Sequence, residues 1–265
     1  MSDLLTERSS RIVAARKLTR RSGRNDAGLF LAEGRQAVAE ALADPAGVRE
    51  VFATEAAAAA HSDLLARTPV AVRLVTEKAA AVLSETVTPQ GLVAVCALRD
   101  VPAADVLAAP PRLAVALAEL ADPGNAGTVL RTAEACGGGA VVFGAGSADP
   151  FGGKAVRASA GSLFHVDVVR AADLSTLLPA FRAAGGTVLA ADGGGGVTLD
   201  EVAVDGRLSS GPVLWLFGNE ARGVPAELAA LADARVRIPM RGRAESLNLA
   251  AAAAICLYST QLAQG

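Results

Sequence analysis

Residues 112–143 have the sequence RLAVALAELADPGNAGTVLRTAEACGGGAVVF, and this stretch decides the fold class. It begins with an apolar run at 113–120, passes through a Pro/Gly/Asn turn into a helical segment at 126–136, and ends in a second apolar run at 140–143. Neither apolar run alternates with polar residues, so each is expected to be a strand buried on both faces. The stretch therefore predicts a strand–helix–strand unit of a parallel sheet.

The same pattern continues to the C-terminus. Further apolar runs, expected as strands, lie at 165–169, 187–191, 213–217 and 235–238, and further helices are expected at 174–184, 226–231 and 247–262. Strands that each lead into a helix predict an α/β fold with a mostly parallel sheet. Such sheets bind their ligands at the loops that leave the carboxyl ends of the strands. We therefore expect the functional residues in these loops.

The upstream part predicts a second, smaller α/β unit. Short β-rich runs lie at 29–31, 48–54, 70–75 and 91–98, with Ala-rich helical segments at 56–66 and 77–83. Residues 100–111 contain Pro102, Pro110 and Pro111 without hydrophobic periodicity, which is typical of a linker. We therefore expect one domain at 1–99, a linker at 100–111 and a second domain at 112–265.

Composition excludes several classes of protein. With 265 residues, 52% hydrophobic and 20% charged, the chain can bury a sizeable core. It has no uninterrupted apolar run of about 18 residues, as a membrane span requires, and the first residues lack the apolar core of a secretory signal. Its three cysteines (Cys96, Cys136 and Cys256) and two histidines are widely spaced. We therefore expect a cytoplasmic protein with neither a disulfide framework nor a metal site.

The charges are unevenly distributed along the chain. Lys and Arg number 25 against 27 Asp and Glu, so the net charge of −2 does not indicate a nucleic-acid-binding protein. The segment 8–24 nevertheless holds seven bases and no acid: Arg8, Arg11, Arg16, Lys17, Arg20, Arg21 and Arg24. These bases form either a solvated helix face or a patch that contacts phosphates. An aromatic content of 3% argues against stacking platforms for single-stranded nucleic acid.

The signatures of the commonest α/β enzymes are absent. The glycine-rich loop at 144–146 lacks the third glycine of a dinucleotide-binding fingerprint, and the loop at 192–196 lacks its spacing. Gly152, Gly153 and Lys154 are followed by Ala155 rather than Ser or Thr, and no G-x-S-x-G occurs. These absences exclude dinucleotide-dependent oxidoreductases, P-loop nucleotidases and α/β-hydrolases.

Three polar blocks follow expected strands. The first is DPGNAG at 122–127 with Arg131 in the helix behind it, the second GNEARG at 218–223, and the third IPMRGRAESLN at 238–248. Structural interpretations exist for each block, because Asn125 could cap a helix, Arg131 could be a surface charge and Glu220 could begin a helix. Ser246 is a natural N-cap for the last helix, so Asn248, unfavourable inside a helix, requires another explanation.

Taken together, the three blocks resemble the three signatures of the SpoU/TrmH family of RNA ribose 2′-O-methyltransferases, in the SPOUT superfamily. They read N-x-G-x-x-x-R-T-A at 125–133, G-N-E-x-x-G at 218–223 and I-P-M-x-G-x-x-x-S-L-N at 238–248. The segment KAVRASAGS at 154–162 is also similar to the family, and the resemblance extends from 112 to the C-terminus. The basic N-terminal segment and FLAEG at 30–34 resemble the L30e-like substrate-binding domain of many members.

The resemblance implies a fold, a cofactor and a site. It implies a deep trefoil knot in the C-terminal domain, S-adenosylmethionine bound in the cleft of the knot, no metal, and a homodimer formed through the knotted domain and its last helix. The implied cofactor-binding residues are Gly218, Ile238, Leu247, Leu216, Met240, Ala191 and Asn219. The implied catalytic residues are Arg131, Asn125, Glu220, Ser246 and Asn248, and the seven N-terminal bases are the expected RNA-binding residues.

The implied function is 2′-O-methylation of a ribose in RNA. Because members with an L30e-like domain mostly act on large-subunit ribosomal RNA, we expect 23S ribosomal RNA as the substrate. A guanidinium with a pKa above about 12 is a poor base, so we expect Arg131 to anchor phosphate and to stabilise the developing alkoxide. The alternatives are a tRNA methyltransferase, a non-catalytic RNA-binding protein and a small-molecule methyltransferase, the last disfavoured by the basic N-terminal segment.

Overall fold

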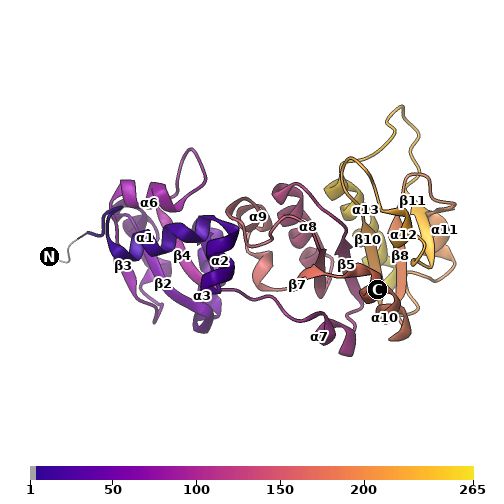
Figure 1. The fold of residues 1–265 in the computed structure, drawn as a ribbon, viewed down its shortest axis with the longest axis horizontal. Helices are drawn as coiled ribbons and strands as arrows, with labels where there is room; N and C mark the ends of the chain where they lie inside the picture. The colour runs from indigo at the N-terminus through magenta and orange to yellow at the C-terminus, as the bar shows by residue number, and fades with distance from the viewer. Residues whose placement is uncertain (1–3) are drawn as a thin grey trace. The chain divides into compact units, whose positions relative to one another are not determined.

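The computed structural model of the chain describes residues 4–265, which form two compact units (Figure 1). The first unit contains the chain up to Arg99 together with Asp149–Phe164, and the second contains Asp100–Ala148 and His165–Gly265. The sequence predicts a break near the same place, at 99, but places the segment 149–164 in the second domain, whereas in the structure this segment belongs to the first unit. Each unit has its own sheet and its own core.

The second unit is built on a seven-stranded sheet in which every neighbouring pair is parallel. The strand order is β7-β6-β5-β10-β8-β11-β9. The strands are β5 (Leu113–Leu117), β6 (Ala140–Gly144), β7 (Asp167–Ala172), β8 (Thr187–Ala191), β9 (Val197–Thr198), β10 (Val213–Phe217) and β11 (Ala234–Arg237). The α/β class and the parallel sheet predicted from the apolar runs are therefore confirmed.

Helices cover both faces of this sheet, which explains why its strands lack polar alternation. On one face α7 (Ala103–Ala108), α10 (Leu174–Ala183) and α12 (Ala226–Ala229) pack on a core that includes Phe181 and Leu216. On the other face α8 (Pro123–Ala135) and α13 (Leu249–Gln264) pack on each other and on β5, while α11 (Leu199–Val204) contacts α13. The buried indole of Trp215 donates a hydrogen bond to Thr260 of α13 at 2.8 Å.

The expected linker at 100–111 is largely ordered structure of the second unit. Helix α7 lies within it, and its Val106 is buried in the core. Before the helix, Asp100 accepts two hydrogen bonds from the Arg170 guanidinium, at 3.0 and 2.8 Å, and the amide of Val101 donates to Val168. The prolines of this stretch gave a linker-like composition, but they flank a short helix rather than a flexible connection.

The first unit is a four-stranded sheet with helices around it. Its order is β1-β4-β2-β3, with β4 antiparallel to both neighbours and β3 parallel to β2. The strands are β1 (Leu29–Glu33), β2 (Val48–Ala53), β3 (Val72–Leu74) and β4 (Leu92–Ala97). The helices are α1 (Ser10–Arg16), α2 (Arg21–Ala27), α3 (Arg35–Ala43), α4 (Glu55–Ala60), α5 (Ser62–Leu65), α6 (Glu77–Leu83) and α9 (Gly153–Ser159), with 3₁₀ turns η1 (Lys17–Thr19), η2 (Pro45–Gly47) and η3 (Ser162–Phe164).

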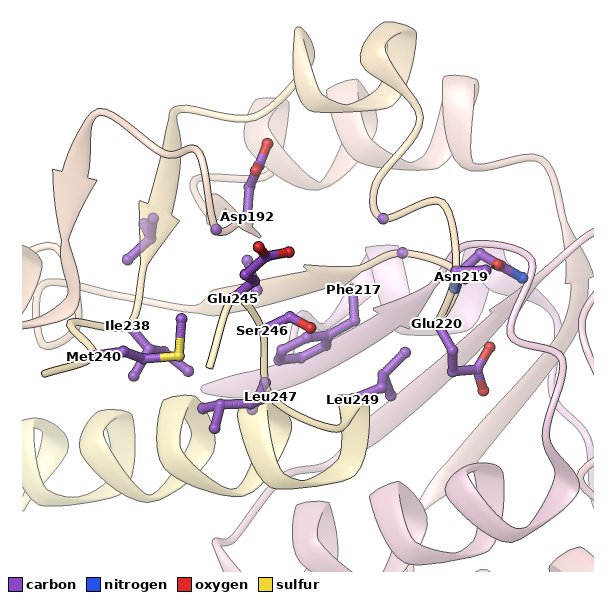
Figure 2. Close-up of a pocket in the computed structure, with 17 residues that line it drawn as sticks. Asp192, Phe217, Asn219, Glu220, Ile238, Met240, Glu245, Ser246, Leu247 and Leu249 are labelled. Atoms are coloured by element: carbon purple, nitrogen blue, oxygen red, sulfur yellow. Dashed lines mark hydrogen bonds between the residues drawn. The ribbon is translucent and has the colours of Figure 1, made fainter. Parts of the chain in front are cut away.

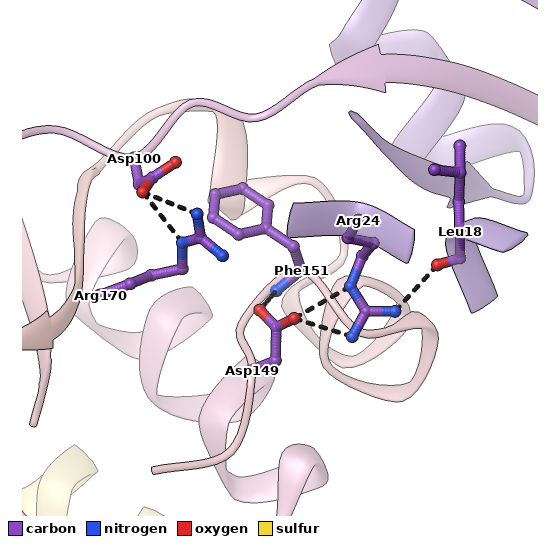
Figure 3. Close-up of polar contacts among 6 residues, drawn as sticks. All are labelled: Leu18, Arg24, Asp100, Asp149, Phe151 and Arg170. Atoms are coloured by element: carbon purple, nitrogen blue, oxygen red, sulfur yellow. Dashed lines mark hydrogen bonds and ion pairs between the residues drawn. The ribbon is translucent and has the colours of Figure 1, made fainter. Parts of the chain in front are cut away.

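The segment Asp149–Phe164 belongs to the first unit because it fills that unit's core. Asp149 accepts two hydrogen bonds from the Arg24 guanidinium, at 2.9 and 2.7 Å, while a third guanidinium nitrogen donates to the Leu18 carbonyl (Figure 3). The rings of Phe30 and Phe151 lie 5.0 Å apart between centroids. The Arg24–Asp149 contact joins residues 125 positions apart, so no local pattern in the sequence indicates it.

This contact corrects one predicted RNA-binding residue. Arg24 is 4% exposed and its guanidinium is committed to Asp149 and Leu18, so it is not available to bind a phosphate. The other six bases of the N-terminal segment are exposed, and among them Arg11 forms an ion pair with Glu50 at 3.2 Å.

None of the helices between residues 4 and 265 combines the length and the hydropathy that a membrane span requires.

Breaking the Arg24–Asp149 pair should destabilise the first unit. We expect Arg24→Ala to lower the free energy of unfolding by about 3–5 kcal/mol, because it leaves a buried carboxylate without a partner. Replacing both partners, as Arg24→Met with Asp149→Leu, should restore much of this loss. Urea unfolding followed by circular dichroism measures the effect, while fluorescence of the single tryptophan, Trp215, follows the second unit separately. The exposed Arg16→Ala is the control, and equal stability of Arg24→Ala and this control would contradict the prediction.

Candidate functional site

A cavity of about 280 Å³ lies at the carboxyl ends of β8, β10 and β11, where a parallel sheet is expected to bind its ligand (Figure 2). Three loops and the start of α13 line it. The lining residues are Ala191, Asp192, Gly193, Phe217, Gly218, Asn219, Glu220, Ala221, Gly223, Val236, Ile238, Met240, Glu245, Ser246, Leu247, Leu249 and Ala252. Two of the polar blocks singled out in the sequence, at 218–223 and 238–248, therefore meet at one cavity.

The loop after β10 closes tightly on itself. The backbone groups of Asn219 and Gly223 exchange two hydrogen bonds, at 2.9 and 2.8 Å. A Cβ atom on Gly218 would come within 2.0 Å of the Gly223 backbone, and Gly223 has a φ of +71°. Glycine is therefore required at both ends of the turn. This turn fixes the backbone conformation of the residues between the two glycines, Asn219 and Glu220 among them.

Glu220 uses that turn to reach the loop after β5. One carboxylate oxygen accepts a hydrogen bond from the Ala121 amide at 3.1 Å. The other accepts from the Asp122 amide at 3.1 Å and from Nδ2 of Asn125 at 3.0 Å. Partial burial acts to raise the pKa of Glu220, but the hydrogen bonds to Asn125 and to backbone amides outweigh it, and the net pKa is lowered. The side chain is therefore held as a carboxylate.

Asn219 also connects the loop after β10 to the loop after β5. Its Nδ2 donates to the Glu119 carbonyl at 2.8 Å, and its Oδ1 accepts from the amides of Ala221 and Arg222. Glu119 has a φ of +53°, which is unusual for a residue with a side chain, and its carboxylate pairs with Arg222. The loops after β5 and β10 therefore hold each other from both sides.

The helix starts differ from those predicted, with a consequence for the site. Asn248, not Ser246, is the N-cap of α13, since its Oδ1 accepts from the amides of Ala250 and Ala251 at 2.9 and 3.3 Å. Its Nδ2 points to Asn125 Oδ1 at 3.4 Å. Asp122, rather than Asn125, caps α8. Asn125 is thereby free to link Glu220 to Asn248, and Ser246 lines the cavity.

The structure places most of the predicted cofactor-binding residues at this cavity. Ala191, Gly218, Asn219, Ile238, Met240 and Leu247 line it. Leu216 does not, because its side chain is fully buried in the core on the opposite side of β10, and the next residue, Phe217, faces the cavity instead. Sequence reasoning also missed Asp192 and Glu245, although one directly follows an expected strand and the other directly precedes Ser246.

The predicted catalytic residues fall into two groups. Glu220 and Ser246 line the cavity, and Asn125 and Asn248 are joined to Glu220 by hydrogen bonds. Arg131 lies apart, exposed on α8 and outside the cavity lining. Its guanidinium has no hydrogen-bond or ion-pair partner within residues 4–265. The same residues contain no cluster of His, Cys, Asp and Glu that could hold a metal ion.

The Glu220 contacts predict a pH-dependent stability. Glu220→Gln places an amide NH₂ against backbone donors, so the variant should melt a few degrees below the wild type at pH 7. A pKa lowered by folding stabilises the protein above the ordinary value of 4.5, and this stabilisation is lost as the pH falls below it. The difference in Tm should therefore shrink below pH 4.5. Trp215 fluorescence on heating measures this, with exposed Glu227→Gln as control, and a constant difference down to acid pH would contradict it.

Comparison with known proteins agrees with this geometry. Residues 112–258 match the SpoU rRNA Methylase family, and residues 9–94 match the MRM3-like substrate binding domain. The chain is 34% identical over 258 residues to the Bacillus subtilis 23S rRNA (guanosine(2553)-2′-O)-methyltransferase RlmP, covering 97% of this chain and 98% of the relative.

Solved structures give the same result. An AdoMet-bound rRNA methyltransferase from Sinorhizobium meliloti superimposes with a TM-score of 0.84 at 32% identity, covering 98% of this chain and 97% of the other. The SpoU methyltransferase AviRb from Streptomyces viridochromogenes, in complex with AdoMet, gives 0.81 at 27% identity, covering 96% and 98%. With its family match over 112–258 and this similarity along the whole chain, the protein belongs to the SpoU rRNA methylase family.

Proposed function

We propose that the protein transfers a methyl group from S-adenosylmethionine to a ribose 2′-oxygen of 23S ribosomal RNA. The observation that carries this proposal is the hydrogen-bonded set of Glu220, Asn125 and Asn248 beside a cavity at the carboxyl ends of the strands. The B. subtilis relative, named for guanosine 2553 of 23S rRNA, aligns over both units and supports ribosomal RNA as the substrate.

The cavity suits S-adenosylmethionine. Apolar side chains of Ile238, Met240 and Leu247 provide surfaces for an adenine ring toward one end of the cavity. Phe217, Leu249 and Gly218 also line the cavity. The charged residues among the lining residues are all carboxylates, which favours a ligand with positive charge. When bound, this cofactor supplies a methyl group on a positively charged sulfonium, which is already reactive toward an oxygen nucleophile.

The protein's own contribution is to orient the ribose and to manage its proton. Glu220 accepts hydrogen bonds from two amides and Asn125, so its role is to position Asn125 and the two loops rather than to take the proton. Arg131 carries a permanent positive charge and has no protein partner within residues 4–265. It anchors an RNA phosphate and stabilises the charge that develops on the 2′-oxygen.

We also propose the family's trefoil knot and homodimer for this chain. The segment 238–248 lies at the cavity beside the loops that follow β8 and β10, where such a knot would be tied. Helix α13 exposes Ile255, Tyr258 and Leu262, which are three and four positions apart and so share one face. That face suits contact with a second copy of the chain. An RNA substrate is also consistent with the predicted cytoplasmic location.

The RNA-binding residues proposed for the first unit are the exposed members of the basic segment, without Arg24. They are Arg8, Arg11, Arg16, Lys17, Arg20 and Arg21. They lie on α1, on the turn η1, at the start of α2 and just before α1, so they are close along the chain. Because few aromatic residues are present, the proposed substrate is folded RNA recognised through shape and phosphates.

Transfer of a tritiated methyl group from S-adenosylmethionine to 23S, 16S and tRNA transcripts tests the reaction. We expect labelling of 23S RNA at one ribose, detected as one site resistant to alkaline cleavage. Because the role of Arg131 depends on charge, Arg131→Lys should keep measurable activity while Arg131→Ala loses nearly all. Equal and complete loss in both variants would contradict a role based on charge.

The same experiment separates the alternative functions. Labelling of tRNA alone would keep the chemistry and replace the substrate. Cofactor binding without labelling of any naked RNA would identify an assembly intermediate as the substrate. Absence of cofactor binding in the wild type would overturn the proposal in favour of a non-catalytic RNA-binding protein.

Salt dependence of RNA binding tests the basic segment. Each phosphate contact that is removed should reduce the slope of log K against log salt by about 0.7–0.9. We expect the double variant Arg16→Ala, Arg20→Ala to bind RNA more weakly and to lose about 1.4–1.8 of this slope. The matched control replaces Arg49 and Arg67, two exposed arginines of the same unit outside the segment. An equal effect of both double variants would rule out a specific role for the segment.

A further inference from the structure

Glu245 is the one carboxylate of the cavity lining that has no protein partner within residues 4–265. Asp192 is held by the Arg235 guanidinium, at 2.9 and 2.7 Å, and by the Gly194 amide at 2.8 Å. Glu220 is held by the loop after β5. A negatively charged side chain that lines a cavity without an internal partner is available to a ligand.

The place of Glu245 along the cavity indicates which part of a ligand it meets. In Figure 2, Ile238 and Met240 lie toward one end and Asn219 and Glu220 toward the other, with the Glu245 carboxylate between them. The first end is apolar, while the second adjoins the hydrogen-bonded set that includes Asn125 and Asn248. The cavity therefore runs from an apolar end, past a free carboxylate, to a polar end.

This order matches the order of groups in an adenosine-containing cofactor, and the argument here rests on the proposed function. The apolar end accepts the adenine ring, and the polar end is where the RNA ribose must meet the reacting methyl group. The cofactor's own ribose lies between adenine and sulfonium, and so beside Glu245. A carboxylate has two acceptor oxygens and can accept hydrogen bonds from both hydroxyls of a vicinal diol.

We propose that Glu245 is a specificity-determining residue that binds the ribose diol of S-adenosylmethionine. The 2′- and 3′-hydroxyls donate to the two carboxylate oxygens, and a ligand without a 2′-hydroxyl leaves a charged acceptor unsatisfied. Sites built to bind a hydroxyl reject analogues that lack it strongly, for that reason. Glu245 is three residues before Asn248, whose side chain caps α13 and contacts Asn125. The segment that carries Glu245 is therefore fixed, at its C-terminal end, to the hydrogen-bonded set.

Isothermal titration calorimetry, with three ligands and with the wild type and two variants, tests this assignment. The ligands are S-adenosylmethionine, 5′-methylthioadenosine and the 2′-deoxy form of 5′-methylthioadenosine. We expect Glu245→Ala to weaken binding of the first two by about tenfold or more, the range for hydrogen bonds to a charged group. The wild type should reject the 2′-deoxy ligand by a similar factor, whereas Glu245→Ala should bind both thioadenosines about equally. Glu227→Gln, an exposed carboxylate outside the cavity lining, is the matched control and should behave as wild type.

Each other outcome has a distinct meaning. If Glu245→Ala weakens S-adenosylmethionine but not 5′-methylthioadenosine, the residue binds the ammonium or sulfonium group, and the diol assignment is wrong. If Glu245→Ala binds all ligands as the wild type does while the wild type methylates RNA, the inference fails and the proposed function stands. If the wild type does not bind S-adenosylmethionine, the proposed function fails and the inference fails with it.

Discussion

The loops after β5 and β10 are held together by reciprocal hydrogen bonds, and the arrangement of the site depends on this contact. Glu220 accepts from the amides of Ala121 and Asp122, and Asn219 donates to the carbonyl of Glu119. The contact is possible because β5 and β10 are parallel neighbours whose last residues, Leu117 and Phe217, are paired in register. Without it Asn125 would keep only its 3.4 Å contact with Asn248, so the side chain that joins α8 to the cap of α13 would be held from one side alone.

Much of this arrangement could be predicted from the sequence, because it follows from the order of buried strands. Unbroken apolar runs followed by helices indicated a parallel sheet, and the polar blocks at the strand ends indicated where a site would form. Asn125 and Glu220 are 95 residues apart, yet they meet because both follow strands that are adjacent in the sheet. The pattern of apolar runs is enough to predict the parallel sheet. The resemblance to a family depends instead on the three motifs at 125–133, 218–223 and 238–248.

The predictions for Leu216, Arg24 and Ser246 differ from the structure for one physical reason. The burial of a side chain and its hydrogen-bond or ion-pair partners are decided by residues distant in the sequence. Leu216 and Phe217 are equally apolar, and only the packing of the helices decides which faces the core. Arg24 lies in a basic run, and its partner is 125 residues away. Ser246 and Asn248 are both residue types that cap helices well. In the structure Asn248 caps α13, which starts at Leu249, and its side chain also contacts Asn125, which is distant in the sequence.

The uneven distribution of charge fits the two partners proposed for the protein. Exposed bases gather in the N-terminal segment of the first unit, while the charged residues lining the cavity of the second are Asp192, Glu220 and Glu245. A polyanionic substrate and a cationic cofactor require opposite potentials, and the net charge of −2, from 25 Lys and Arg against 27 Asp and Glu, does not reveal this local separation. The same reasoning explains the position of Arg131. A guanidinium lining the cavity would pair with a carboxylate and oppose the positive cofactor, whereas on the exposed side of α8 it remains available to a phosphate.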